Sequence, residues 1–395
     1  MGNASRRLSS LAWEDGTIPS IQRAGGVFAK IWRLSFVYIG LICAVAAIGF
    51  LLLFSAADGD LNAYAVPQMK RFAVGLFIAI CVALIDIRFI MKLAYPAYVG
   101  TLLLLIGVEL FGRVGMGAQR WLDIGGVSLQ PSELMKIAII LALARYFHSL
   151  PTREGVPIKS LIIPALLIAA PVLLVLNQPD LGTALLIALG ALTVAFMAGV
   201  PLRLFVFGAA GAAAVMPFAW TQLHDYQKAR VMTFLDPSRD PLGAGYHITQ
   251  SKIALGSGGT WGRGLMEGTQ SHLSFLPESQ TDFIFTVLAE EFGLFGASGL
   301  VMIYVVMIGL GWIMAGSVKN HFGRLMAAGL NTMFFLYVLV NIAMVIGLMP
   351  VVGVPLPLVS YGGTAMLTVL LGLGLLMNAH VHRDVELSRN EGVIL

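Results

Sequence analysis

The chain has 395 residues, of which 58% are hydrophobic and only 12% are charged. Because a soluble domain carries about a quarter charged residues, this composition excludes a soluble protein and predicts an all-α integral membrane protein. The net charge of +4 comes from basic residues scattered among short loops, which indicates positively charged cytoplasmic loops and no nucleic-acid partner.

The N-terminal segment 1–33 is polar and contains Arg6, Arg7 and Arg23. It has no short apolar core followed by a small-residue cleavage site, so we expect a cytoplasmic tail without a cleaved signal peptide. A membrane span needs about 20 apolar residues, and we predict about ten transmembrane helices. The predicted spans are 34–53, 72–84, 93–111, 132–147, 161–176, 181–198, 202–220, 283–314, 325–348 and 365–380.

Short-loop basic residues predict the orientation, because they are more frequent on the side of the N-terminus than on the opposite side. Both termini are therefore expected in the cytoplasm. The transmembrane domain then covers 34–380 and is followed by a cytoplasmic tail at 381–395. One long periplasmic loop, 222–281, separates helices seven and eight. The other basic residues expected outside are Lys70, Arg71, Arg113 and Arg120.

Polar residues gather at four places on the predicted outer face, and the first is the start of the fourth span. Pro131 or Ser132 is suited to begin this helix, which places Glu133 and Lys136 three residues apart on one helical face. An unpaired charge one turn into the membrane would be costly. Two interpretations stay open: an ion pair that satisfies itself, or the wall of a polar cavity that meets a charged substrate with nearby Arg120.

The second place is the turn 177–183, which contains Gln178 and Asp180. These residues either form an ordinary turn or line the same cavity. The third place is the long outer loop, with Lys252 and a glycine cluster at 256–264. The cluster lacks the spacing of a nucleotide-binding fingerprint, so it consists either of turns or of backbone amides that cradle an anion.

The fourth place, 349–364, combines prolines and glycines with Ser360. Irregular backbone at membrane depth is tolerated only where it is buried in protein or lines a cavity. The seven histidines show no zinc spacing, so no metal site can be placed. We expect these four places to form one outward-facing polar cavity.

Asp282 lies where the long outer loop enters the eighth span. A carboxylate in a membrane helix usually marks function, but Asp282, like Thr281, is also suited to cap the helix start. Glu290 lies two turns further on and is a candidate for the same cavity, with loop or core structure as the alternative. This span is too long for one straight helix, and Gly293 is among the glycines that predict a break.

Six groups of residues together resemble the SEDS family (shape, elongation, division and sporulation) and occur in that family's order. The similarity extends from the third span to the end of the membrane core and is closest to the elongation branch. Gln280 and Thr286 depart from the family pattern without affecting the acid. The matching residues are Gln119-Arg120-Trp121-Leu122 with Pro131-Ser132-Glu133, Gln178-Pro179-Asp180-Leu181-Gly182-Thr183, Gly245-Tyr246-His247-Ile248, Gly256-Ser257-Gly258-Gly259, Thr281-Asp282-Phe283-Ile284-Phe285, and Pro355-Leu356-Pro357 with Ser360-Tyr361-Gly362-Gly363.

The resemblance implies a peptidoglycan glycosyltransferase that polymerises lipid II into a growing glycan strand on the outer face of the bacterial inner membrane. It implies a class B penicillin-binding protein, a transpeptidase, as partner, beside other membrane proteins of the elongation complex. It also implies a divalent cation, Mg or Mn, whose ligands the sequence does not locate. The family's essential aspartate falls on Asp282, and its buried acid–lysine pair on Glu133 and Lys136.

The chemistry itself favours one carboxylate. The donor sugar leaves with a diphosphate, which needs cations more than a proton, while the acceptor hydroxyl needs a general base. Asp282 is the candidate base, and Arg120, Lys136, Lys252 or a metal would bind the diphosphate. Such a single displacement inverts the anomeric centre. A lipid II flippase and a non-catalytic scaffold of the elongation machinery remain as alternatives, although polar residues on one face favour an enzyme.

Overall fold

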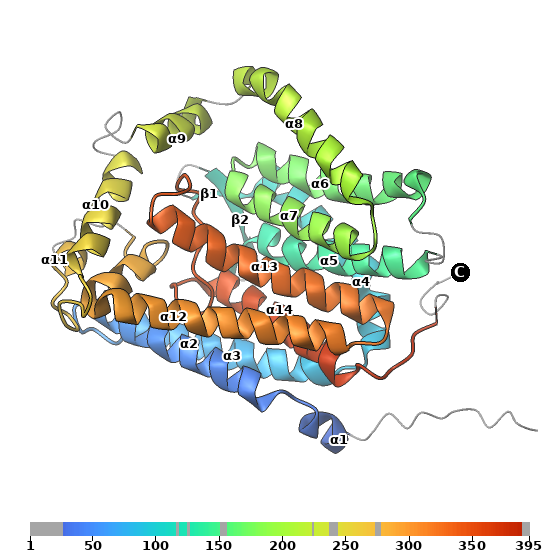
Figure 1. Ribbon diagram of the computed structural model, residues 1–395, viewed down its shortest axis with the longest axis horizontal. Helices are drawn as coiled ribbons and strands as arrows, with labels where there is room; N and C mark the ends of the chain where they lie inside the picture. The colour runs from blue at the N-terminus through green and yellow to red at the C-terminus, as the bar shows by residue number, and fades with distance from the viewer. Residues whose placement is uncertain are drawn as a thin grey trace, which may run out of the picture.

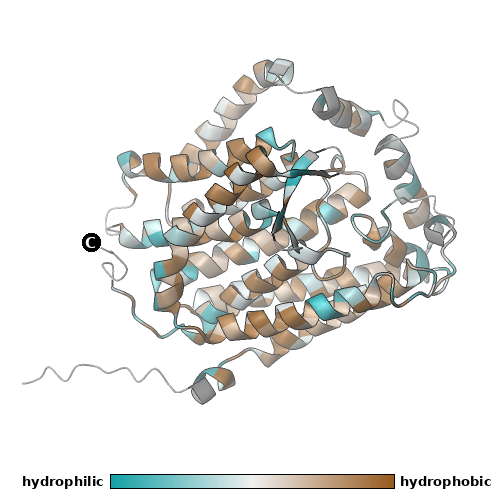
Figure 2. Cartoon of the chain, turned by 180° about the vertical axis from the view of Figure 1, so that it is seen from behind, coloured by the Kyte–Doolittle hydropathy of each residue, from teal (hydrophilic) through white to brown (hydrophobic). Residues whose placement is uncertain are grey.

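The computed structural model describes residues 27–115, 118–124, 127–150, 156–222, 225–236, 244–272 and 278–388. Long helices lie side by side in one bundle, and hydrophobic residues cover most of their length (Figures 1 and 2). The first helices are α1 (Val27–Trp32), α2 (Phe36–Ser55), α3 (Ala65–Leu84), α4 (Ile87–Phe111), α5 (Pro131–Ser149), the 3-10 helix η1 (Ile158–Leu161), α6 (Ile162–Asn177) and α7 (Leu181–Met197).

The second half of the chain completes the bundle around one central helix, α13. It packs against α5, α7, α12 and α14, and 78% of its apolar window is buried. The elements of this half are α8 (Leu202–Gln222), α9 (Asp225–Leu235), α10 (Ala244–Ser257), α11 (Thr269–His272), α12 (Ile284–Ser317), α13 (His321–Val345) and α14 (Gly363–Val381).

Among the described residues, seven helices are long and apolar enough to cross a membrane. They are α2, α3, α4, α6 with the preceding η1, α12, α13 and α14. Helix α7 and the apolar part of α8, Leu202–Phe218, are shorter. The predicted helical, multi-span membrane fold is therefore confirmed. The number of about ten spans stays a prediction, in which α5, α7 and α8 supply the remaining three.

The prediction of an all-α chain is wrong between α4 and α5, where three short strands form an antiparallel sheet. Cross-strand polar contacts hold it: Arg113 Nη1 lies 3.1 Å from Asp123 Oδ2, and Ser128 Oγ donates to Asp123 Oδ1. The hydrogen bond from Ser128, with the Arg113 guanidinium, lowers the pKa of Asp123. The strands are β1 (Arg113–Gly115), β2 (Ala118–Ile124) and β3 (Val127–Leu129).

Helices α3 and α4 begin more than one turn earlier than predicted because polar residues interrupt their apolar runs. Helix α3 begins at Ala65 and not at 72, and its first turns hold the fully buried Gln68, whose Nε2 donates to Ser360 O at 2.9 Å. Helix α4 begins at Ile87 and not at 93, and Asp86 caps it by accepting from Arg88 N at 2.8 Å. A search for continuous apolar runs misses such polar first turns.

The predicted long loop also contains structure, since α9, α10 and α11 lie within it. Helices α8 and α9 lead away from the bundle, and α10 returns to pack against the start of α12 (Figure 1). The glycine cluster explains this contact. A Cβ at Gly258 would lie 2.0 Å from Ala289 O, and one at Gly262 would lie 2.1 Å from Glu291 O. These glycines permit close backbone packing. The amides of Gly262, Arg263 and Gly264 donate to backbone carbonyls, which favours the turn interpretation of the cluster.

The predicted break in α12 is confirmed at Gly293, whose φ of 65° and ψ of −161° are not helical. The adjacent backbone amides reach across to the glycine cluster, because Leu294 N donates to Gly259 O at 3.0 Å. The first part of α12 is therefore a short segment clamped against α10. This segment carries Asp282 at its entry.

Candidate active site

Asp282 lies at the junction that the sequence predicts, but it does not cap the helix. Helix α12 begins at Ile284, and its N-cap residue is Phe283, whose side chain makes no capping hydrogen bond. The helix-cap interpretation of Asp282 is therefore not what the structure shows. The side chain is half-buried, so it stays accessible at the end of the bundle.

The backbone around Asp282 is held by side chains from distant parts of the chain. Asn341 Nδ2 donates to Asp282 O at 2.9 Å and to Val354 O at 2.7 Å. Ser360 Oγ, 4% exposed, donates to Thr281 O at 2.6 Å. These contacts hold the backbone from which the Asp282 side chain projects, as expected for a preorganised site.

The irregular segment 349–364 forms the floor beside this carboxylate, as predicted for a backbone that lines a site. Tyr361 N donates to Gln280 O at 2.8 Å. Asp282 Oδ2 lies 3.7 Å from the position that a Cβ of Gly353 would occupy, and Gly353 has a φ of 72°. A left-handed backbone next to the carboxylate requires glycine there. Two non-glycine residues with left-handed backbone, Glu278 (φ 57°) and Leu358 (φ 67°), flank the same place, where strain is typical of functional sites.

Glu133 and Lys136 form the predicted ion pair at the start of α5, with Lys136 Nζ 2.5 Å from Glu133 Oε1. Tyr337 completes the cluster: its hydroxyl donates to Glu133 Oε2 at 2.7 Å, and Lys136 Nζ lies 4.4 Å from the centre of its ring. Glu133 is 4% exposed and Lys136 1%. Burying both charges is tolerable only because each has close polar partners.

Helix α13 connects this pair with Asp282. Tyr337 contacts Glu133, and Asn341 contacts the backbone of Asp282. Four residues along a helix span about 6 Å, so the pair lies about one turn deeper in the bundle than Asp282. Neither Tyr337 nor Asn341 was identified from the sequence, because nothing near them in the chain marks them as polar contacts of the site.

Arg120 and the turn 177–183 come together as predicted, but their contacts are mainly structural. Arg120 Nη1 lies 3.8 Å from Asp180 Oδ2, and its Nε donates to Gln178 O at 3.3 Å. Asp180 also caps α7 by accepting from Thr183 N at 3.1 Å. Gln178 is 5% exposed and donates to Leu105 O at 3.0 Å. This group holds β2 against α7.

The turn is nevertheless in contact with the Asp282 floor. A Cβ at Gly182 would lie 2.9 Å from Val352 O. Residue 352 precedes Gly353, which faces the Asp282 carboxylate. Three of the four polar places therefore contact one another near Asp282. That all four line one outward-facing cavity stays a prediction.

Glu290 and Glu291 bind the outer loop and not the Asp282 floor. Glu290 is fully buried, and its Oε1 accepts from Gln270 N at 2.9 Å. Glu291 Oε1 accepts from Ser55 Oγ and from Met266 N, the latter at 3.3 Å. Of the two interpretations left open for Glu290, the structure favours loop structure.

Two cations that face the aqueous end of the bundle lie beside the floor. Arg71, one of the basic residues expected on the outer face, stacks on Tyr361 with Cζ 4.8 Å from the ring centre. The exposed Lys252 lies against Gly347, where a Cβ would come within 2.2 Å of Lys252 Cε. Tyr361 N in turn donates to Gln280 O, so Arg71 lies next to the turn that carries Asp282.

An apolar groove of about 600 Å³ runs along α4, α5 and α14. It is lined at one end by Phe89 and at the other by Leu134, the residue after Glu133. A lining of this kind suits a hydrocarbon chain. The groove therefore runs along the bundle from Phe89 to the buried pair of Glu133 and Lys136.

The described residues contain no group of three or more His, Cys, Asp or Glu side chains that could hold a metal ion. Mg²⁺ is commonly held by one or two carboxylates together with substrate phosphates. The residues present do not form a dedicated cation site, and the divalent cation stays a prediction tied to the substrate.

Comparison with known proteins decides the family. The family model described as cell cycle protein, FtsW/RodA/SpoVE, matches residues 29–385. The chain belongs to this family. The resemblance to the SEDS proteins is thereby confirmed.

Individual members agree with the assignment to the FtsW/RodA/SpoVE family. Peptidoglycan glycosyltransferase MrdB of Escherichia coli K12 is 47% identical over 348 residues, which cover 87% of this chain and 93% of that protein. A chain in a solved structure described as structural coordination of polymerization and crosslinking by a peptidoglycan synthase complex matches with a TM-score of 0.78 and 34% identity. The match covers 89% of this chain and 99% of that chain. The crystal structure of the rod shape determining protein RodA of Thermus thermophilus has a TM-score of 0.68 and 30% identity, covering 89% and 98%.

Proposed function

We propose that this chain polymerises lipid II, with Asp282 as the general base. That it is a peptidoglycan glycosyltransferase follows from its relatives in the family, at up to 47% identity over most of the chain. The observation that supports the role of Asp282 is the way side chains from distant segments hold its backbone in place. The carboxylate is half-buried at the entry of α12, and Asn341 and Ser360 hold its backbone from distant segments.

The proposed reaction is one displacement. The acceptor hydroxyl gives its proton to a carboxylate oxygen of Asp282 as its oxygen forms a bond to the anomeric carbon of the donor. The bond from that carbon to the diphosphate breaks, and the lipid diphosphate leaves with the electron pair. One carboxylate suffices because the diphosphate leaving group is stable as an anion and needs no proton. In glycosidases the leaving group is a sugar oxygen, which a second carboxyl group must protonate.

The leaving diphosphate requires positive charge at the mouth of the site. Among the described residues, the half-buried Arg71 stacks on Tyr361 and the exposed Lys252 lies against Gly347, both beside the segment 349–364. Arg120 and Lys136 are already engaged, the first by Asp180 and two carbonyls and the second by Glu133. We infer that Arg71 and Lys252 bind the diphosphate directly. Glu133, Lys136 and Arg120 then determine the electrostatic potential and the shape of the site. A bound divalent cation would add charge stabilisation to the diphosphate.

The apolar groove along α4 and α5 is the proposed position of the lipid tail of the substrate. It ends at Leu134, next to the buried pair. A tail in this groove would bring the attached diphosphate to the polar end of the bundle. The flippase alternative requires polar access from both ends, and the residues bonded around Asp282 lie at one end.

Replacement of Arg71 by glutamine should weaken use of lipid II. Loss of a charge-assisted contact to phosphate is worth about 1.5–3 kcal/mol, so kcat/KM should fall about 10- to 150-fold. The neighbouring Lys70 is exposed and makes no stacking contact with Tyr361, so Lys70→Gln is the matched control and should retain activity. Steady-state polymerisation of lipid II by both variants measures the difference. Equal activities would remove Arg71 from the site.

The site is proposed to face the periplasm from the bacterial inner membrane, with both termini in the cytoplasm. A class B penicillin-binding protein and other elongation-complex membrane proteins are the proposed partners. The structure puts the exposed Thr260 at the Asp282 end of the bundle, since its carbonyl accepts from Phe295 N at 3.3 Å.

A cysteine at Thr260, in a chain from which Cys43 and Cys81 have been removed, should react with an impermeant thiol reagent in intact spheroplasts. An exposed residue at the other end, Lys319, provides the opposite control as Lys319→Cys. Labelling of Lys319→Cys but not of Thr260→Cys before lysis would contradict the proposed orientation.

A further inference from the structure

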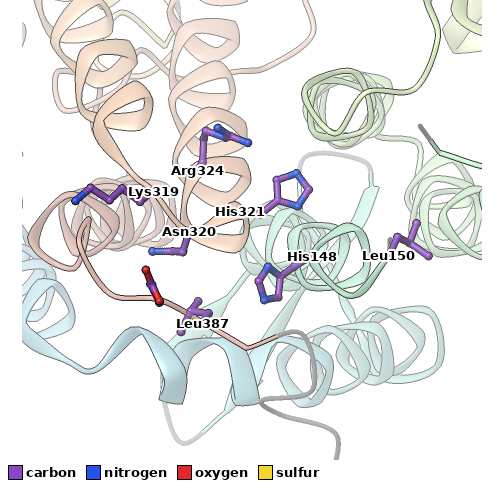
Figure 3. Close-up of a pocket in the computed structure, with 8 residues that line it drawn as sticks. His148, Leu150, Lys319, Asn320, His321, Arg324 and Leu387 are labelled. Atoms are coloured by element: carbon purple, nitrogen blue, oxygen red, sulfur yellow. The ribbon is translucent and has the colours of Figure 1, made fainter. Parts of the chain in front are cut away.

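Helix α13 extends through the bundle from the end opposite Asp282 to the segment beside Asp282. It begins at His321, next to a pocket of about 430 Å³ that His148 also lines (Figure 3). It ends at Val345, and Asn341 lies one turn before that end. Twenty residues of α-helix span about 30 Å, so Asn341 and this pocket lie at opposite ends of the helix. Asn341 thus projects from a helix that the core holds along most of its length.

The side-chain amide of Asn341 joins two segments that are distant in the sequence. Its Nδ2 donates to Asp282 O at 2.9 Å and to Val354 O at 2.7 Å. The side chain is fully buried, and its Oδ1 accepts no hydrogen bond from the described residues. A buried amide oxygen without a partner destabilises a fold. The two hydrogen bonds from the nitrogen are therefore the contribution that this amide makes.

The two carbonyl groups belong to opposite sides of the candidate site. Asp282 Oδ2 lies 3.7 Å from the position that a Cβ of Gly353 would occupy, and Val354 is the next residue. The separation of the two carbonyls therefore determines how far the carboxylate lies from the backbone at Gly353. Ser360 supports this region from within the segment 349–364 itself. Asn341, in contrast, attaches both sides to the central helix.

Contacts on either side of Asn341 fix this part of α13. One turn before it, the Tyr337 hydroxyl donates to Glu133 Oε2 at 2.7 Å. One turn after it, Val345 O accepts from Ser251 Oγ of α10 at 2.8 Å, and Ser251 is fully buried. The amide of Asn341 therefore has a rigid support, which a positioning group requires.

We propose that Asn341 is a positioning residue that holds the Asp282 carboxylate at its working distance from the segment 349–364. It acts on the reaction through the backbone of Asp282, and the inference rests on the proposed role of Asp282 as the base. A displacement of about 1 Å in a reacting group can cost about 100-fold in rate. Loss of the bridge should therefore lower kcat, and it should leave KM for lipid II unchanged because the proposed diphosphate ligands are not altered.

The test measures kcat and KM for lipid II with the full chain purified in detergent. Asn341→Leu removes both hydrogen bonds and should lower kcat about 10- to 100-fold. Asn341→Ser keeps one hydroxyl donor and should recover part of this loss. Thermal unfolding of each variant shows whether it is folded.

Asn331→Leu is the matched control, because Asn331 also projects from α13 and is fully buried. Its Nδ2 likewise donates to a backbone carbonyl, Ile308 O at 3.0 Å, and its Oδ1 likewise has no partner among the described residues. It lies about 15 Å along the helix from Asn341. Asn331→Leu should therefore lose stability as Asn341→Leu does, but keep kcat.

Equal kcat values for folded Asn341→Leu and Asn331→Leu would overturn the proposal, as would a raised KM with unchanged kcat. If Asn341→Leu does not fold, the comparison of Asn341→Ser with Asn331→Ser decides in the same way. Asp282→Asn in the same assay separates the two claims. Full activity of that variant would contradict the proposed base, whereas its inactivity beside unchanged kcat in both Asn341 variants would contradict only the positioning role.

Discussion

Asp282→Asn should reduce polymer formation from lipid II at least about 100-fold, because an amide cannot take the proton of the acceptor hydroxyl at neutral pH. General-base catalysis contributes about 100- to 10,000-fold, which sets the expected range. The variant should fold normally. Asn341 bonds to the carbonyl oxygen of residue 282 and not to its side chain, so the substitution leaves that contact in place.

Glu278→Gln is the matched control, because it removes an exposed carboxylate four residues earlier in the same turn. It should retain most of the polymerisation rate. The measurement is the initial rate of lipid II consumption by each purified variant, with thermal unfolding as the check of folding. Equal losses in Asp282→Asn and Glu278→Gln would indicate that only the local negative charge matters. Full activity of folded Asp282→Asn would remove it as the base.

Glu133→Ala should destabilise the protein more than the double variant Glu133→Ala/Lys136→Met. Removing one partner of a buried pair leaves an uncompensated charge and costs about 3–5 kcal/mol, whereas replacing both charges by apolar groups costs much less. The Tyr337 hydroxyl loses its Glu133 acceptor in both variants, so its contribution cancels in the comparison.

Thermal unfolding of the three proteins in detergent measures this difference. A double variant less stable than the single one would contradict the pairing. Activity separates two roles of Lys136: if its ammonium also acts on the diphosphate, the double variant should be stable but inactive. Restored activity together with restored stability would indicate a purely structural pair.

Local sequence predicted those parts of the site that depend on spacing within one element. Glu133 and Lys136 meet because residues three apart share a helical face, and Asp282 lies at a junction between polar and apolar sequence. The break in α12 at Gly293 could be predicted because the apolar run is too long for one straight span. In each case the controlling geometry lies within a few residues.

The rest of the site depends on contacts between distant segments. Tyr337 reaches Glu133 across 204 positions, and Ser360 reaches Thr281 across 79. The role of Glu290 depended on the outer loop folding back over α12, which the glycine-rich sequence does not reveal by itself. The small sheet was missed because its strands are short and stand between glycines, where turns are the usual interpretation.

The most direct test of the account is the size of the products that purified protein, with its proposed transpeptidase partner and a divalent cation, forms from lipid II. The account predicts long glycan polymer from the wild type and from Glu278→Gln, and unreacted lipid II from Asp282→Asn. Absence of polymer from folded wild type with the partner present would contradict the proposed polymerase activity, and polymer of normal length from folded Asp282→Asn would contradict the proposed base.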